Sequence, residues 1–361
     1  MSLFVSIVLA VVLAGVLMWL ISVLFFRGED LRVYDRAGPS EAWVSFQRPG
    51  GPSEGHRKAV DFTREFNASL RGVWRKKRLQ LLREHMDNLG RAALCSSAVT
   101  PVTAGGVPAE WVCAENASPD RRVLYLHGGA YVAGSPLSHR NITNRFSEIT
   151  GASVLAIDYR LMPEHTRKSG ILDCRQAYRW ILENGPDGPA AAARLVIAGD
   201  SAGGNLSLSL SAWVRDEGLR RPDAVVALSP SVDATFSSPS IPLNVKTDVM
   251  LGPLFAFLLR VPAWLRRWLF LLESRYLPNN PVVSPVFGDL SGLPPTLIQV
   301  SEAEMLLDDA RRYVNKARAG GTQAVAQSWA DMLHVWHFFY PEVEEADEAW
   351  LEIKQFLSGR L

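Results

Sequence analysis

The chain has 361 residues, of which 48% are hydrophobic and 21% charged, and its formal net charge at pH 7 is +1. This balance is that of an ordinary globular protein and gives no basic excess, so no nucleic acid partner is expected. The three cysteines, Cys95, Cys113 and Cys174, form no CxxC pair, so we expect neither a disulfide framework nor a zinc site.

The first segment, residues 3–26, carries no charge. A helix of this length, at about 1.5 Å per residue, exceeds the roughly 30 Å hydrocarbon core of a bilayer. A cleaved signal peptide is the alternative, but no basic residue precedes the run and no small-residue cleavage site follows it. We therefore expect residues 1–27 to be a membrane anchor. Arg27 and Arg32 weakly favour a cytoplasmic catalytic domain, and the side stays open.

Residues 28–95 are expected to form an N-terminal cap region. Polar stretches rich in Gly and Pro come first, and a basic amphipathic helical pattern follows from Lys58 to Leu89. The simplest interpretation is a cap helix with a solvated basic face. The alternative is that this face rests on anionic lipid beside the anchor.

From Val107 onward, short apolar runs alternate with helical patterns, as in a mostly parallel, doubly wound sheet covered on both faces. The expected strands are WVCA, RVLYLHG, SVLAIDY, RLVIAGD, AVVALSP, PTLIQVS and AVAQSWA. The expected helices lie near residues 138–150, 169–184, 203–216, 305–319 and 343–358. The fold class is α/β, with a catalytic domain over residues 96–361.

An insertion at about residues 240–280 separates two of these strands by more than a normal connection. It is strongly apolar, but Arg260, Arg266 and Arg267 make a second transmembrane helix costly. We expect a lid over a substrate pocket that also touches the membrane surface.

The pattern GxSxG occurs as Gly199-Asp200-Ser201-Ala202-Gly203. An apolar run leads straight into it and a helical pattern follows, which is the strand-turn-helix context of a nucleophile elbow. Small residues are needed there because the turn is sharp. Ser201 is therefore the expected nucleophile; the alternative is an ordinary turn before a helix.

A second glycine-rich turn, HGGA at 127–130, ends an upstream apolar run. Gly128 and Gly129 lack side chains, so their N–H groups can approach a substrate oxygen. Together with the N–H of Ala202 they are expected to form an oxyanion hole. His127 is expected to hold the loop rather than transfer protons.

A general base is expected after the last strand, where His334 and His337 both occur. The chain order of nucleophile, acid and histidine that such folds show excludes the earlier histidines. Position alone leaves His334 and His337 nearly equal.

The acid is expected after the preceding strand, in SEAEMLLDDA. Asp308 and Asp309 fall inside a predicted helix. Glu302 and Glu304 are therefore the better-placed carboxylates.

Several motifs together resemble the hormone-sensitive-lipase-like α/β-hydrolase esterases. They are HGGA at 127–130, YRLMPEH at 159–165, GDSAGGNL at 199–206, the stretch at 283–300 and the MLHVWHFF ending. The resemblance covers roughly residues 95–358 and implies Glu304 as the acid, His334 as the base and a structural Asp200. Ala130 departs from the family, because it stands where the third glycine of HGGG occurs.

The expected function is hydrolysis of apolar carboxylic esters of short to medium acyl length through an acyl-enzyme on Ser201. No metal or organic cofactor is implied. One alternative is an amide deacetylase with the same three residues. The other is a non-catalytic receptor on this fold, as the plant gibberellin receptors are, but such a receptor would lack the histidine.

Overall fold

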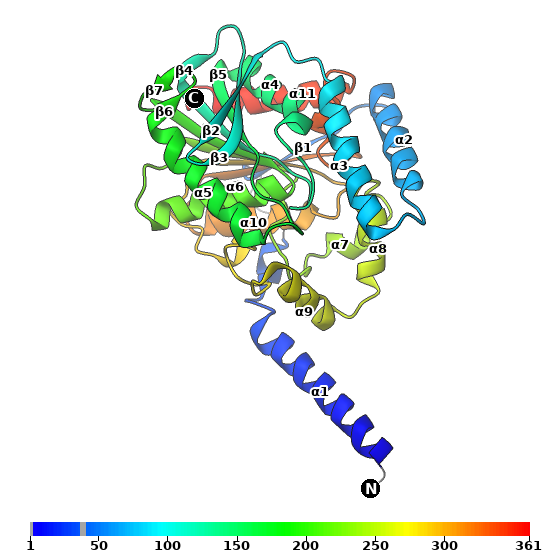
Figure 1. Ribbon diagram of the computed structural model, residues 1–361. Coiled ribbons are helices and arrows are strands. Elements are labelled where there is room, and N and C mark those ends of the chain that lie inside the picture. The colour runs from blue at the N-terminus through cyan, green and yellow to red at the C-terminus, as the bar shows by residue number, and fades with distance from the viewer. Residues whose placement is uncertain (1–2, 37–40) are drawn as a thin grey trace.

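The computed structural model describes residues 3–36 and 41–361; residues 1–2 of the expected anchor and 37–40 of the expected cap region lie outside them. Within the described residues a nine-stranded sheet forms the centre of the body (Figure 1). Helix α1 (Leu3–Phe25) projects away from this body, and the C-terminus lies at the opposite end of the view.

The sheet has the order β1-β11-β10-β9-β8-β4-β5-β3-β2 and is parallel except where β3 pairs with β2 and β5. Its strands are β1 (Trp43–Phe46), β2 (Ala98–Ala104), β3 (Val107–Cys113), β4 (Ser118–Leu126), β5 (Ala152–Ile157), β8 (Arg194–Asp200), β9 (Ala224–Leu228), β10 (Thr296–Ser301) and β11 (Ala324–Trp329). β6 (Asn184–Gly185) and β7 (Gly188–Pro189) form a separate hairpin. The central strands are apolar throughout because helices cover both of their faces.

Two hydrophobic cores separate the sheet from its helices. One core packs α4 (Arg140–Thr150) and α11 (Glu344–Leu357) on one face of the sheet. The other packs α5 (Arg167–Glu183), α6 (Ala202–Asp216) and α10 (Leu307–Ala319) on the opposite face. Short 3-10 turns complete the body: η1 (Leu31–Tyr34), η2 (Leu137–His139), η3 (Pro285–Phe287) and η4 (Trp336–Phe339). The doubly wound α/β architecture and all seven expected strands are confirmed.

Residues 28–95 were expected to form a cap. The first part of this segment belongs to the body, and only the second part belongs to the cap. β1 pairs in parallel with β11, with Trp43 opposite Ala326, and so forms one edge of the main sheet. Arg312 of α10 donates to Asp35 at 2.5 Å, which holds the preceding chain against the body. Within this segment the cap helices begin at α2, after β1 of the main sheet.

The cap consists of helices from two separate parts of the chain. α2 (Glu54–Ser69) and α3 (Arg75–Ala92) form a helical pair beside the sheet (Figure 1). The insertion supplies α7 (Ser240–Leu243), α8 (Gly252–Leu259) and α9 (Ala263–Ser274). Asn67 Nδ2 donates to the Val249 carbonyl at 2.9 Å and joins the two parts.

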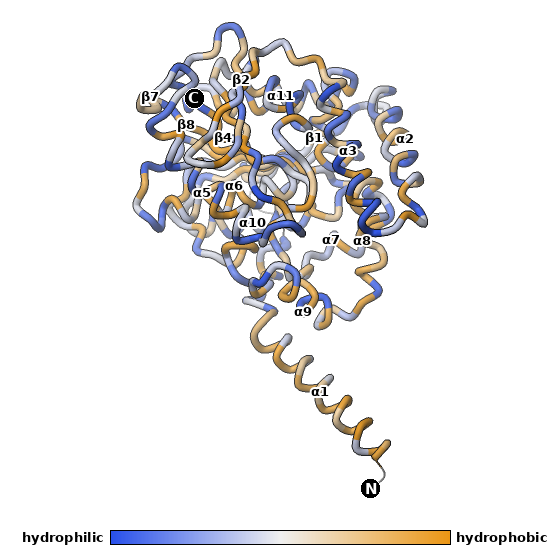
Figure 2. Tube along the Cα trace, viewed as in Figure 1, coloured by the Kyte–Doolittle hydropathy of each residue, from blue (hydrophilic) through white to orange (hydrophobic). Residues whose placement is uncertain are grey.

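The end of α1 contacts α9. Trp268 Nε1 donates to the Met18 carbonyl at 3.0 Å, and Ser22 Oγ donates to the Trp264 carbonyl at 3.2 Å. The Phe26 ring meets the Trp268 ring edge-on, with centroids 4.7 Å apart. Figure 2 shows that α1 is hydrophobic along nearly all of its length. It is the one helix of the described chain that is long and apolar enough to cross a membrane.

Candidate active site

Ser201 occupies the turn between β8 and α6. β8 is buried as far as Asp200 and α6 begins at Ala202, so a single residue makes the turn. The Ser201 backbone has φ 50° and ψ −113°, a strained conformation for an L-residue. Its N–H donates to the Leu228 carbonyl at 2.7 Å, which fixes the turn to β9.

The glycines around Ser201 allow very close backbone packing. A Cβ on Gly203 would lie 1.8 Å from the Leu126 carbonyl oxygen, and one on Gly199 would lie 2.5 Å from the same atom. The small residues of the elbow are therefore required by contact with β4 as well as by the turn itself.

His334 connects Ser201 to a buried carboxylate. Its Nε2 lies 2.9 Å from Ser201 Oγ, and its Nδ1 lies 2.7 Å from Glu304 Oε2. The other carboxylate oxygen of Glu304 accepts from Ser229 Oγ at 2.7 Å and from the Ser301 N–H at 2.8 Å. These bonds hold the carboxylate in place, so it can fix the orientation and tautomer of the imidazole.

The surroundings of His334 favour its protonated form. Burial lowers the pKa of this imidazole, but the charge and hydrogen bond of Glu304 oppose burial, with Asp248 adding to them, and the net pKa is raised above 6.5. The same contact with Glu304 stabilises the imidazolium that forms when His334 accepts a proton.

The alternative base and acids lie elsewhere. His337 Nε2 contacts Gln299 Oε1 at 2.6 Å in the core, and burial lowers its pKa to about 3. Glu302 accepts from Ser328, Asp308 from the Ser240 N–H, and Asp309 from the N–H groups of Val232 and Asp233. Of the carboxylates considered from the sequence, Glu304 is the one that reaches His334.

The oxyanion loop differs from expectation at Gly128. The Gly128 N–H donates to Asp200 Oδ1 at 2.9 Å and is therefore not directed at the site. Tyr125 OH donates to the same oxygen at 2.6 Å, so the buried Asp200 holds the loop, as the resemblance implied. Gly129 and Ala130, with φ 109° and 54°, turn past Ser201 and line the cavity beside it.

His127 lies behind this loop. Its Nδ1 contacts the Gly128 carbonyl at 2.8 Å and its ring stacks on Tyr159 at 4.2 Å. Burial lowers the pKa of His127 to about 3, so the ring is neutral. It supports the loop and does not face Ser201.

Helix α3 is bound tightly to the same loop. Arg83 donates from Nε to the Val132 carbonyl at 2.7 Å and from Nη2 to the Met162 carbonyl at 3.1 Å. Farther along α3, a Cβ on Gly90 would lie 1.8 Å from the Leu137 carbonyl oxygen. The cap thus packs against the backbone that follows the oxyanion loop.

Asp248 is a neighbour of the site that sequence reasoning missed. It is buried, and it accepts from the N–H of Met305 at 3.0 Å and of Leu251 at 2.8 Å. Burial raises the pKa of its carboxyl group. Asp248 connects the insertion to the acid loop, and because that contact is not local, no sequence motif signals it.

The cavity at Ser201 is small and apolar. Its volume is about 150 Å³, and helices of both cap parts line it together with the chain after His334. Its apolar walls include Phe62, Phe66, Leu70, Leu82, Met86, Leu89, Met250, Leu251, Leu254, Phe338 and Phe339. His85 also lines it and stacks on Phe66 with centroids 3.5 Å apart.

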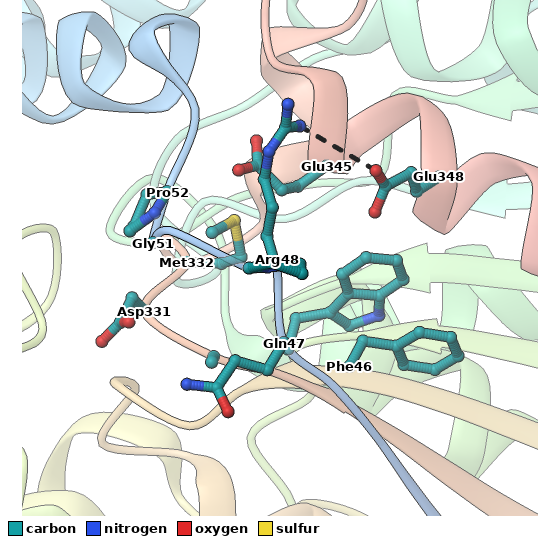
Figure 3. A pocket seen from close by; sticks show the side chains of 12 residues that line it. Phe46, Gln47, Arg48, Gly51, Pro52, Asp331, Met332, Glu345 and Glu348 are labelled. Atoms are coloured by element: carbon teal, nitrogen blue, oxygen red, sulfur yellow. Dashed lines mark ion pairs between the residues drawn. The ribbon is translucent and has the colours of Figure 1, made fainter.

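A second hollow, of about 140 Å³, lies between the chain after β1 and helix α11 (Figure 3). Arg48 crosses it and pairs with Glu348 at 3.9 Å. It contains neither Ser201 nor His334, and we assign it no function. Within residues 3–36 and 41–361, no three His, Cys, Asp or Glu side chains converge as a metal site requires.

Comparison with known proteins points to one group. A family profile described as alpha/beta hydrolase fold matches residues 123–338. An acetyl-hydrolase of Streptomyces hygroscopicus is 39% identical over 254 residues, which cover 69% of this chain and 78% of that protein. An esterase of Acinetobacter venetianus is 31% identical over 261 residues, covering 72% and 82%. A solved esterase of the bacterial hormone-sensitive lipase family superimposes with a TM-score of 0.75 at 34% identity, covering 85% of this chain and 98% of that one.

Proposed function

The chain belongs to the α/β-hydrolase family of the hormone-sensitive-lipase-like carboxylesterases, and we propose that it cleaves short apolar esters through Ser201, His334 and Glu304. The observation that carries the proposal is the continuous hydrogen-bonded chain from Ser201 Oγ through His334 to Glu304 beneath an apolar cavity. That the enzyme is a serine carboxylesterase follows from the family; the residue roles and substrate size are the proposal.

The reaction begins when His334 Nε2 accepts the Ser201 proton and the serine oxygen attacks the ester carbonyl carbon. Glu304 stabilises the imidazolium that results. His334 then gives the proton to the leaving alcohol, which departs and leaves an acyl-enzyme. Water then attacks the acyl carbonyl carbon while His334 takes its proton. The bond from this carbon to Ser201 Oγ breaks, His334 returns the proton to Ser201 Oγ, and the carboxylic acid leaves.

The oxyanion of each tetrahedral intermediate needs backbone donors beside Ser201. Ala202 is the first residue of α6, so its N–H has no partner within the helix. In the described chain no acceptor contacts the N–H of Gly129 or Ala130, both at the cavity. We assign the oxyanion hole to these three N–H groups, with Ala130 in place of the originally expected Gly128.

The acyl group is proposed to be short. A cavity of about 150 Å³ lies well below the roughly 300–1,000 Å³ that drug-sized ligands occupy, and its walls carry few polar groups. The receptor alternative is disfavoured because His334 is present and hydrogen-bonded to Ser201.

The test is hydrolysis of p-nitrophenyl esters of increasing acyl length by the full-length protein and its Ser201→Ala variant. We expect serine-dependent turnover that is highest for the shortest acyl groups. Matched p-nitroanilides measure the amide alternative. Turnover that survives Ser201→Ala, or a maximum at long acyl chains, would contradict the proposal.

We also propose that α1 is a retained membrane anchor. Only 6% of its most hydrophobic window is buried, so it is not a core helix. A cleaved signal sequence would forfeit the contacts of Met18, Ser22 and Phe26 with α9. Carbonate washing should leave the protein, with its N-terminal segment intact, in the membrane pellet; release into the supernatant would refute the anchor.

A further inference from the structure

Helix α3 begins with four consecutive cations, Arg75, Lys76, Lys77 and Arg78, all exposed. The first turn of a helix carries the positive end of the helix dipole, where cations destabilise and anions stabilise. This turn holds no acidic residue, and Trp74 at the N-cap makes no side-chain hydrogen bond. The helix therefore starts with uncompensated positive charge and backbone donors that an anion would satisfy.

Among the described residues, no ion pair includes any of these four cations. The nearest ion pairs along the described chain, Arg64–Asp61 and Arg83–Glu164, lie to either side and do not include the four cations. The four cations are therefore free to pair with an anionic surface outside the described chain. In Figure 2 the start of α3 is strongly hydrophilic, beside a hydrophobic α8.

Apolar side chains are exposed around the same turn. Trp74 is 84% exposed, and on α8 Phe257 is 75% exposed. The turn between α2 and α3 lies at the end of the body from which α1 leaves, as do α8 and α9 (Figure 1). A tryptophan beside a basic cluster is the composition of a surface that sits at lipid headgroups.

The contact of α1 with α9 sets how close this surface comes to the bilayer. α9 contacts α1 from Met18 onward, at the end of α1 that joins the body (Figure 1). In a bilayer that α1 crosses, α9 therefore lies beside the end of the span, where Trp264 and Trp268 suit an aromatic belt.

We propose that the basic turn, residues 70–78, docks on the anionic lipid surface of the membrane that holds α1. The rim of the active-site cavity then faces the bilayer, because Phe62 and Leu254 both line the cavity and are 43% and 46% exposed. Esters dissolved in the membrane enter the cavity between α2 and α8. This inference rests on the proposed function for the entry of substrate, but the docking itself does not.

The docking is tested with the full-length protein reconstituted in vesicles of phosphatidylcholine alone or with phosphatidylserine. Acetylation by an amine-reactive reagent, read by mass spectrometry, reports the accessibility of Lys76 and Lys77. Lys354, exposed on α11 on the far side of the body, is the internal reference. We expect Lys76 and Lys77 to be protected in anionic vesicles and reactive in phosphatidylcholine, with Lys354 equally reactive in both.

The variant Arg75→Gln/Arg78→Gln keeps both lysine reporters and removes two charges. Each cation near an anionic surface contributes about a fivefold factor, so docking should weaken by up to about 25-fold and the protection should be lost. Arg221→Gln/Arg360→Gln is the matched control, because it also removes two positive charges. Arg221 precedes β9 and Arg360 follows α11, so neither belongs to the basic turn, and this variant should leave the protection unchanged. Equal reactivity of the lysines in both lipids, or equal effects of the two variants, would overturn the proposal.

Activity separates the docking from the chemistry. Arg75→Gln/Arg78→Gln should hydrolyse p-nitrophenyl acetate at the wild-type rate and lose turnover of a bilayer-dissolved ester in anionic vesicles. Equal loss on both substrates would refute a role confined to docking. Wild-type protein that protects its lysines but hydrolyses neither ester would contradict the proposed function and leave the docking intact.

Discussion

Replacing Glu304 by glutamine removes one negative charge from the active site and leaves the volume of the side chain nearly unchanged. The carboxylate lies 2.7 Å from His334 Nδ1, and both side chains are buried. Two unit charges about 4 Å apart interact by about 4 kcal/mol at an effective dielectric constant of about 20. That interaction stabilises the imidazolium formed during attack, so its loss should lower kcat about a thousandfold.

The acidic limb of the pH profile gives a second readout for Glu304→Gln. His334 must be neutral to accept a proton, so wild-type activity should fall as the pH drops through its raised pKa. In the variant burial remains and the opposing charge is gone. The pKa of His334 should therefore decrease, and the acidic limb should move to lower pH while the plateau falls.

Both effects are measured as kcat and kcat/KM for p-nitrophenyl acetate across the pH range. Asp308→Asn is the matched control, because that carboxylate accepts from the Ser240 N–H and does not contact His334. It should keep wild-type kcat per folded enzyme. If Glu304→Gln retains more than about a tenth of kcat, or if Asp308→Asn loses as much, the assignment of the acid is wrong.

Three further substitutions test the site. Gly203→Ala places a Cβ 1.8 Å from the Leu126 carbonyl, so the free energy of unfolding should fall by at least about 1–3 kcal/mol, as thermal unfolding would show; an unchanged Tm would contradict the packing. Ala130 has a φ of 54°, and glycine would remove the strain of this conformation, about 1 kcal/mol. Glycine also gives the unfolded chain more conformational entropy, which costs a similar free energy, so Ala130→Gly should keep Tm and kcat near wild type. Asp248→Asn should move the acidic limb of kcat/KM to lower pH by less than Glu304→Gln, because Asp248 contributes less to the pKa of His334; a larger shift would reverse their roles.

The elements that could be predicted from the sequence are those with local signals. The central strands are continuous apolar runs between helical patterns, and Ser201 stands in a strand-turn-helix context. β1 was missed because it is four residues long and half-exposed, and its partner β11 lies at the other end of the chain. β2 was missed because Pro101 interrupts its apolar pattern, which an edge strand tolerates.

Which histidine and which carboxylate serve the site depends on where their side chains point, and the spacing of residues in the sequence does not show this. His334 and His337 are three residues apart, but Val335 between them has a φ of 52°, and His337 turns into the core while His334 faces Ser201. The resemblance favoured His334 and Glu304 before the geometry was known. It did not anticipate that Asp200 would occupy the Gly128 N–H.

The packing of α3 on the oxyanion loop has a consequence for protein engineering. Arg83 binds two carbonyls of the segments that follow this loop, and Gly90 touches the backbone at Leu137. The α2–α3 pair therefore depends on these backbone segments: a chimera that takes the pair from a relative must also take residues 127–139 and the segment around Met162. The insertion that carries α8 and α9 is joined to the acid loop through Asp248, which accepts from the Met305 N–H, so an exchange of selectivity in this insertion must keep Asp248.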